Sequence, residues 1–127
     1  MRFHHIGIAA SEPEKAIAFV RGGWDVTHEE GPVHDPVQDA DLFMLTLIDG
    51  ARIEIVSGKQ VEAFIKRGQV IFHTCYEVDD IDDASARLKK AGAMVVSPPQ
   101  PAILFGGRRV SFLQTKIGLV ELLEATR

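Results

Sequence analysis

The stretch "FHHIGIAASEPEKAIAFVRGGWDV", residues 3–26, returns in altered form as "IFHTCYEVDDIDDASARLKKAGAMVV", residues 71–96. When His5 is aligned with His73, the pattern of residue types is shared over about twenty positions, which marks an internal repeat. Each copy has a short apolar strand, an acidic turn, a helix with small and apolar residues, and a second strand that follows a glycine. Each half of the chain is therefore predicted to begin with a β-α-β unit.

Both copies of the repeat end in a predicted β-hairpin. "LFMLTLIDGARIEIV", residues 42–56, predicts a two-residue turn at Asp49-Gly50, the strongest short hairpin signal in the sequence. "RRVSFLQTKIGLVELLE", residues 108–124, predicts a turn near Lys116-Ile117. The offset between the copies becomes one residue shorter in this region, so one residue is lost in a loop.

The predicted fold class is α+β, with two β-α-β-β-β modules. The modules span residues 1–58 and 70–127, and a linker with one helical turn joins them at residues 59–69. Each module is too small to be stable alone. We therefore expect a single domain, residues 1–127, in which the modules pair into a U-shaped, mostly antiparallel sheet with the helices outside.

Alternation of side chains along the first strand of each module selects an inner face. If the isoleucines of the first strand pack under its helix, His5 and Gly7 face inward. The repeat then turns His73 and Cys75 inward in the same way. Gly7 and Cys75 are equivalent small residues that leave space beside each imidazole.

The hairpins are predicted to place two carboxylates on the same inner faces as the two histidines. A two-residue turn at Asp49-Gly50 places Leu45 opposite Glu54, and the repeat places Phe112 opposite Glu121. Both glutamates then face inward among apolar neighbours, where an unpaired charge costs several kcal/mol, on the order of 3–5. Each carboxylate therefore needs a partner.

Four inward side chains at equivalent positions could share one divalent metal ion: His5, Glu54, His73 and Glu121. A metal would neutralise both carboxylates and accept neutral imidazoles, and two nitrogens, two oxygens and water suit Zn, Ni, Co, Mn or Fe(II). The alternative for any one residue is structural, such as a hydrogen-bonded core histidine or a pair of Glu54 with Arg52. Four residues in register favour the metal.

The motifs "HHIGIAA", "FHTCYEVDDID", "GRRVSFL" and "GLVELLE" occur in an order and spacing that resembles the vicinal oxygen chelate superfamily. This superfamily includes glyoxalase I, methylmalonyl-CoA epimerase, extradiol dioxygenases and bleomycin-resistance proteins. The resemblance covers essentially the whole chain and is strongest to the epimerase and glyoxalase-like branch. It implies paired modules around a metal held by the same four residues.

The resemblance implies a metal-dependent lyase or isomerase that removes a proton beside the carbonyl of a thioester or thiol adduct. Glu54 or Glu121 is the candidate base. Epimerases of the family commonly have glutamine at the position of Glu54, and their extra catalytic glutamate falls near Val37. The loop residues Asp35 and Asp39 are the alternative bases.

Four residues are predicted to contact the substrate: Arg108, Gln114, Phe112 and Cys75. Alternation from Phe112 turns Arg108 toward the cleft and Arg109 away from it, so Arg108 is the candidate anion contact. The alternatives are a solvated loop for "FGGRRV", residues 105–110, and a small apolar core residue for Cys75.

The composition narrows the partners and the location. The net charge is −4 over 127 residues without a run of Lys or Arg, so nucleic acid and anionic membranes are not expected partners. A single cysteine and the lack of an apolar span or signal-peptide pattern predict a cytoplasmic protein. We expect a small-molecule substrate, an acyl-CoA or a thiol adduct, and a symmetric homodimer.

Two other functions remain as alternatives. A drug-binding protein of the bleomycin-resistance kind would use the cleft without a metal, and the four ligands argue against it. An extradiol-type dioxygenase would more usually have two histidines and one glutamate, so Glu54 argues against that function.

Overall fold

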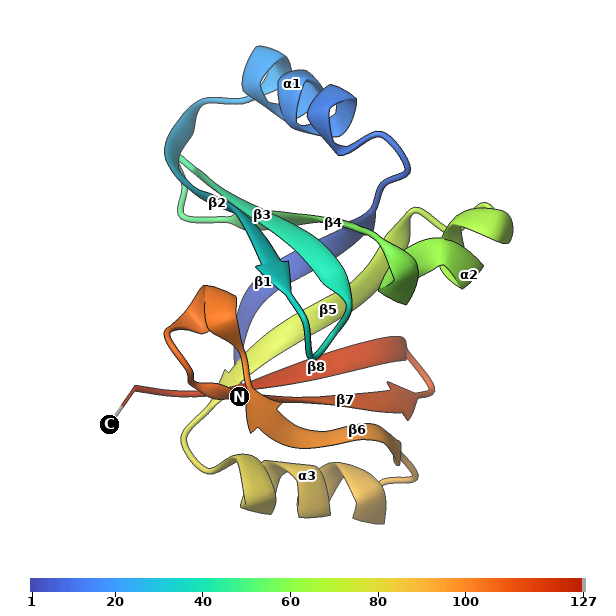
Figure 1. Cartoon of the computed structure of the whole chain (residues 1–127). Coiled ribbons are helices and arrows are strands. Elements are labelled where there is room, and N and C mark those ends of the chain that lie inside the picture. Colours follow the sequence, from blue (N-terminus) through green and yellow to red (C-terminus); the bar gives the residue numbers. More distant parts are fainter. Residues whose placement is uncertain (127) are drawn as a thin grey trace. The chain divides into compact units, whose positions relative to one another are not determined.

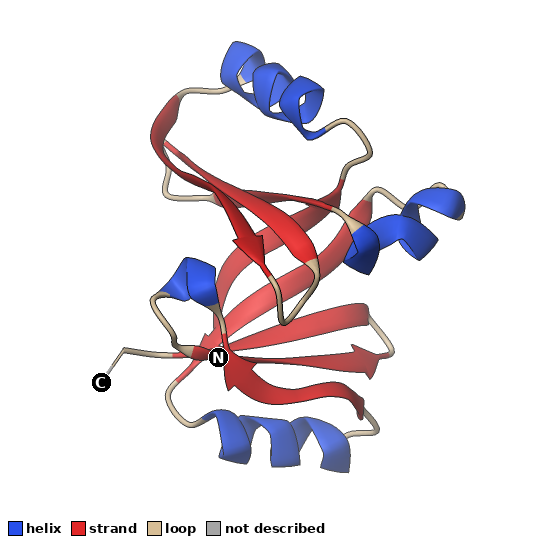
Figure 2. Ribbon diagram, viewed as in Figure 1, coloured by secondary structure: helices blue, strands red, loops and turns tan. Residues whose placement is uncertain are grey.

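Each copy of the repeat folds into the predicted β-α-β-β-β module in the computed structural model, which describes residues 1–126 (Figure 1). The first module consists of β1 (Arg2–Ala9), α1 (Pro13–Gly23), β2 (Val26–Asp35), β3 (Ala40–Leu47) and β4 (Arg52–Ser57). The second consists of β5 (Ile71–Val78), α3 (Ile81–Lys90), β6 (Met94–Pro101), β7 (Arg109–Thr115) and β8 (Gly118–Glu124). The α+β class is therefore confirmed (Figure 2).

The chain divides into two compact units, and each contains a four-stranded sheet. One unit is His5–Phe72, with the order β2-β3-β4-β1, and the other combines Met1–His4 with the chain from His73 onward, with the order β5-β8-β7-β6. Both sheets have the same pairing, because the first strand of the module runs parallel to its last strand and the remaining pairs are antiparallel. The parallel pair is the element that builds the candidate site.

A helix covers one face of each sheet. In the first unit α1 begins with Pro13 at its first turn, a favoured position for proline, and packs Ile17 and Val20 against the sheet. In the second unit the Asp80 side chain caps α3 by accepting a hydrogen bond from the Asp83 N–H at 3.0 Å. These helices bury one set of alternating side chains and leave the other set to form the opposite face.

The apolar side chains under the two helices form separate cores. The core under α1 has its buried residues at Ala10, Val20, Phe43, Leu45, Leu47 and Ile55. The core under α3 has them at Val78, Ile81, Ala84, Leu113, Val120 and Leu122. Neither core contains a histidine or a glutamate, so the predicted ligands lie on the other faces.

The segment predicted as a linker contains two short helical elements, η1 (Lys59–Val61) and α2 (Glu62–Lys66). It packs against its own unit, because Val61 is fully buried and the Gln60 N–H donates to the Asp39 carbonyl at 3.1 Å. A further short element, η2 (Ile103–Phe105), lies between β6 and β7. The longest helix, α1, has 11 residues, and none in residues 1–126 combines the length and hydropathy that a membrane span requires.

The predicted two-residue turn of the first hairpin is wrong by one residue. The Leu47 N–H donates to the Ala51 carbonyl at 2.8 Å, so Ile48, Asp49 and Gly50 form a three-residue loop. Gly50 has a φ of +89°, the left-handed conformation that closes such loops.

This loop changes the register of the hairpin. Met44 lies opposite Glu54, and Leu45 lies opposite Ile53 in the core under α1. Leu45 is therefore not the cross-strand neighbour of Glu54. In the second hairpin Thr115 pairs with Gly118 across the predicted two-residue turn, and Phe112 lies opposite Glu121 as expected. The residue lost between the copies is thus located in this turn.

We predict that Gly50→Ala destabilises the protein by about 1 kcal/mol, because alanine at positive φ brings its Cβ close to the following carbonyl. The matched control is Gly22→Ala inside α1, where an added Cβ meets nothing within 4 Å, as at Gly50. That substitution should stabilise by about 0.5–1 kcal/mol, because alanine favours helix. Urea unfolding of both variants measures the difference, and equal effects would contradict the assigned loop.

Candidate functional site

The first candidate pair is His5 and Glu54, held by the parallel pairing of β1 with β4. The register places Gly7 beside Glu54, and His5 lies two residues earlier on the same face of β1. Because Gly7 has no side chain, the carboxylate has space to approach the imidazole. The His5 Nε2 lies 3.4 Å from the Glu54 Oε1, and the two residues are 0% and 3% exposed.

The second pair repeats this arrangement in the other unit. β5 is parallel to β8, with Cys75 beside Glu121, and the His73 Nε2 lies 3.1 Å from the Glu121 Oε1. His73 and Glu121 are 3% and 2% exposed. The ring of Phe112 packs edge to face against the imidazole of His73, with the centroids 5.4 Å apart. Gly7 and Cys75 therefore occupy equivalent positions, each beside the glutamate of its own unit, as the repeat predicts.

Each pair presents one nitrogen and one oxygen donor in a buried environment. A buried carboxylate must be compensated by a positive charge or by hydrogen bonds. A neutral imidazole and a carboxylate are ligands that Zn and other divalent transition metals accept. The chemistry of both pairs therefore fits the metal ligands predicted from the sequence.

The predicted substrate contacts have different environments. Cys75 is fully buried in an apolar cluster with Ala102, Val110 and Leu123, as its alternative role as a core residue requires. Gln114 is exposed near the β7-β8 turn, where its amide lies 3.4 Å from the Thr115 carbonyl. Phe112 packs on His73. Phe112 therefore contacts the candidate ligand His73 through its ring, and Cys75 lies beside the candidate ligand Glu121 in the strand pairing.

Arg108 is held by an acidic residue that the sequence did not identify as its partner. Its Nη1 donates to the Glu77 Oε2 at 2.8 Å, and its guanidinium lies over the ring of Phe105. Glu77 follows His73 and Cys75 by alternation, so Arg108 lies on the predicted inner side. Arg109 faces the other way, where it binds Glu124 through two hydrogen bonds. The alternation of side chains along β5 from His73 places Glu77 on the same face, and this was the sequence signal that could have identified it as a partner.

Of the two residues considered as alternative bases, Asp35 ends β2 and Asp39 lies in the turn between β2 and β3. The Asp35 Oδ1 accepts hydrogen bonds from the N–H groups of Val37 and Gln38, so this carboxylate stabilises the turn. Asp35 lies opposite Ala40, whereas Glu54 lies opposite Met44. Four residues along β3 correspond to about 13 Å. The turn is therefore distant from the His5–Glu54 pair.

Two arginines set the electrostatics around Glu77. The hydrogen bond from Arg108, followed by the one from Arg2, lowers the pKa of the Glu77 carboxyl below its ordinary value of 4.5, against the effect of burial. Arg2 also contacts Asp79 at 3.0 Å, and these carboxylates raise the pKa of its guanidinium. The Glu77 carboxylate thus remains charged at neutral pH and holds Arg108 in position.

Comparison with known proteins identifies relatives over almost the full chain. Residues 4–112 match the family model described as Glyoxalase/Bleomycin resistance protein/Dioxygenase superfamily. The chain is 34% identical, over 122 residues, to an ethylmalonyl-CoA/methylmalonyl-CoA epimerase of Cereibacter sphaeroides, and the match covers 91% of this chain and 89% of the relative. The resemblance seen in the sequence motifs is confirmed.

Solved structures show the same fold. The methylmalonyl-CoA epimerase of Mycobacterium tuberculosis has a TM-score of 0.78 at 23% identity, covering 99% of this chain and 89% of that one. A Streptomyces coelicolor methylmalonyl-CoA epimerase in complex with 2-nitronate-propionyl-CoA has a TM-score of 0.74 at 24% identity, covering 100% and 99%.

We predict that the stabilising effect of Glu77 disappears in acid. Because its folded pKa is lowered, its contribution is complete above the ordinary glutamate pKa and is lost as the pH falls through the folded value. Glu77→Gln should therefore be less stable than the unmodified protein at about pH 7, and the difference should be smaller at about pH 3, below the ordinary glutamate pKa.

The control is Glu62→Gln on the exposed face of α2, which should change stability little at either pH. Urea unfolding at the two pH values provides the measurement. A difference between Glu77→Gln and the unmodified protein that does not shrink in acid would contradict the assigned ion pair.

Proposed function

The chain belongs to the glyoxalase/bleomycin resistance/dioxygenase superfamily, and we propose that it is a metal-dependent isomerase acting on an acyl-CoA thioester. The main observation that supports this proposal is that two buried His–Glu pairs, His5–Glu54 and His73–Glu121, occupy equivalent positions of the repeat. The name of the Cereibacter sphaeroides relative supports an epimerase and a branched malonyl-CoA substrate. A glyoxalase-type lyase acting on a thiol adduct is the second candidate, because it requires the same ligand types.

The proposed metal ligands are His5, Glu54, His73 and Glu121. Each unit supplies one nitrogen and one oxygen, which by itself is a weak site, so we propose that the modules of one chain pair and bring the four donors to a single ion. This pairing would form the U-shaped sheet predicted from the sequence. The donor set suits Zn, Ni, Co, Mn or Fe(II), with water in the remaining positions.

A divalent ion bound there would act as a Lewis acid that polarises the thioester carbonyl and makes the adjacent C–H more acidic. Epimerisation requires a proton to leave one face of this carbon and return to the opposite face. Two carboxyl groups at repeat-equivalent positions, Glu54 and Glu121, suit this requirement: one, as the carboxylate, would accept the proton, and the other, in its protonated form, would deliver one to the opposite face. Phe112 shields His73 from water beside them.

The remaining sequence-based predictions complete the proposal. Arg108, held by Glu77, is the candidate contact for an anionic group of the substrate. A symmetric homodimer remains a prediction. A metal-free drug-binding protein would have no use for two buried His–Glu pairs, and a dioxygenase site would lack the fourth ligand.

We predict that the purified protein contains about one divalent metal ion per chain. The double variant His5→Ala/Glu121→Ala removes one ligand from each unit and should abolish binding, as measured by elemental analysis. The matched control is His28→Ala/Glu30→Ala, an exposed His–Glu pair on β2 with a contact of 3.3 Å. This control should retain the metal, and an unchanged metal content in the first variant would exclude the proposed ligands.

We predict metal-dependent deuterium incorporation beside the carbonyl when methylmalonyl-CoA or ethylmalonyl-CoA is incubated with the protein in heavy water. Glu121→Gln should lose the exchange even where it retains metal, because an amide cannot accept the proton. Mass spectrometry of the recovered thioester provides the measurement. If such thioesters bind without exchange for every metal supplied, the isomerase proposal fails and a binding function replaces it.

A further inference from the structure

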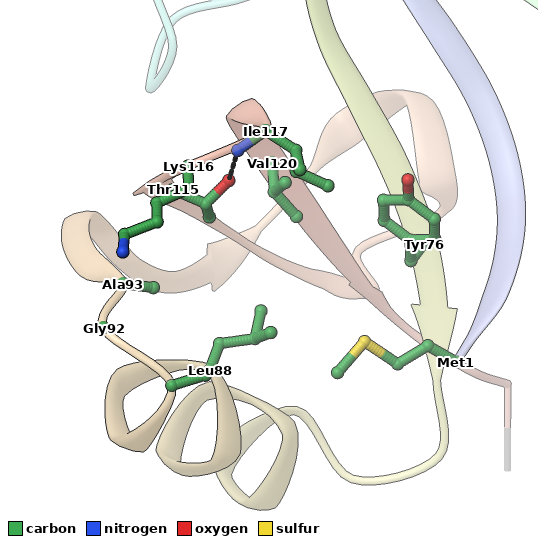
Figure 3. A pocket seen from close by; sticks show the side chains of 10 residues that line it. Met1, Tyr76, Leu88, Gly92, Ala93, Thr115, Lys116, Ile117 and Val120 are labelled. Atoms are coloured by element: carbon green, nitrogen blue, oxygen red, sulfur yellow. Dashed lines mark hydrogen bonds between the residues drawn. The ribbon is translucent and has the colours of Figure 1, made fainter.

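A pocket of about 440 Å³ lies between α3 and the sheet of the second unit, and neither His73 nor Glu121 lines it. Leu88 projects from α3 toward Val120 of β8, with Met1 and Tyr76 at one end and Lys116 at the other (Figure 3). This volume is within the range of small-ligand sites. Its walls are mostly apolar, and nothing in the proposed reaction uses it.

The pocket is on the opposite face of the sheet from the candidate metal ligands. Tyr76 and Val120 point toward α3, whereas Cys75 and Glu121, their neighbours in sequence, point the other way. A ligand bound under α3 would therefore be separated from Glu121 by the sheet itself. The two sites can be tested independently.

The internal repeat shows why this space is open. In the first unit the equivalent helix end reads Gly23-Trp24-Asp25, whereas the second unit has Ala91-Gly92-Ala93. Small side chains at this end leave the edge of the core uncovered, and an added Cβ at Gly92 would meet nothing within 4 Å. The first unit instead has a tryptophan there, Trp24, whose ring makes an edge-to-face contact with Phe19. The first unit has a different pocket under α1, of about 560 Å³, lined by residues that include Pro13, Ile17 and Phe43. The two units therefore differ in the residues at this helix end.

The end of the pocket near Lys116 is positively charged. Lys116 lies beside Ala93 in the turn between β7 and β8, and in the described part of the chain it forms no salt bridge (Figure 3). Lys116 is the charged residue among those that line the pocket.

We propose that this pocket binds a carboxylic acid with a medium-length alkyl chain. The chain would lie between Leu88 and Val120, and the carboxylate would contact Lys116. An apolar channel with a cation at one end is complementary to an amphipathic anion. Binding here requires neither the metal nor the thioester, and it goes beyond the proposed isomerase activity.

The test uses octanoate and 1-octanol as probes, followed through the methyl NMR signals of the metal-loaded protein. Octanoate should shift the signals of Leu88, Ile117 and Val120. It should leave unchanged those of Val20 and Ile53, the counterparts of Leu88 and Val120 in the first unit, and that of Leu47. Lys116→Glu should weaken octanoate binding about fivefold and leave octanol binding unchanged. The matched charge reversal Lys66→Glu on α2 should change neither.

A second variant tests the pocket itself. Ala91→Phe places a ring over the opening at an exposed position and should abolish binding of both probes, with the remaining methyl spectrum preserved. Absence of shifts at millimolar octanoate, or shifts of equal size in both units, would overturn the proposal. Shifts of the same methyl groups that depend on protein concentration without ligand would also overturn it, because a second copy of the chain would then occupy the groove.

Discussion

A carboxylate buried beside an imidazole is the constraint on which this structure depends. Glu54 and Glu121 are almost completely removed from water, and each lies within 3.4 Å of a histidine nitrogen. A charge in this position is tolerated only when its partner is held close, because losing one member of a buried pair costs on the order of 3–5 kcal/mol. The parallel pairing of the first and last strand in each module provides this closeness, since it puts Gly7 or Cys75 beside the carboxylate. A larger residue at either position would occupy the space between the two groups.

The two modules share this arrangement but differ at their periphery. The hairpin of the first module closes through three residues with Gly50 at positive φ, and the hairpin of the second closes through two. One helix ends at a tryptophan and the other at small residues that leave a pocket. Differences of this kind lie on the helix side and in the turns, where they do not alter the donors. The inner face is thus the part that the repeat preserves.

The inner face was also the part of the structure that could best be predicted from the sequence. Alternation along β1 and β5 identified His5 and His73, and the repeat turned two separate residues into a pattern with few structural alternatives. The cross-strand neighbour of Glu54 was assigned wrongly because Asp49-Gly50 suits both a two-residue turn and the end of a three-residue loop. Propensity alone does not decide between the two turns. The one-residue difference between the copies does, because a two-residue turn in the second hairpin implies a three-residue loop in the first.

Long-range ion pairs were beyond such reasoning for a different physical reason. Arg108 was expected to face the inner side, and it does, but its partner Glu77 is 31 residues away and on another strand. The alternation of side chains along a strand predicts which face a residue lies on, but not which charged residues of other strands contact it there. The contact between Arg108 and Glu77 depends on the strand order β5-β8-β7, which brings them close across β8. Because Arg2 also binds Glu77, this carboxylate connects the start of the chain to Arg108. An anion that displaced Glu77 from Arg108 would leave Glu77 bound to Arg2. If an anion binds Arg108 as we propose, it therefore separates Arg108 from a carboxylate that keeps a second cationic partner, which lowers the electrostatic cost of the exchange.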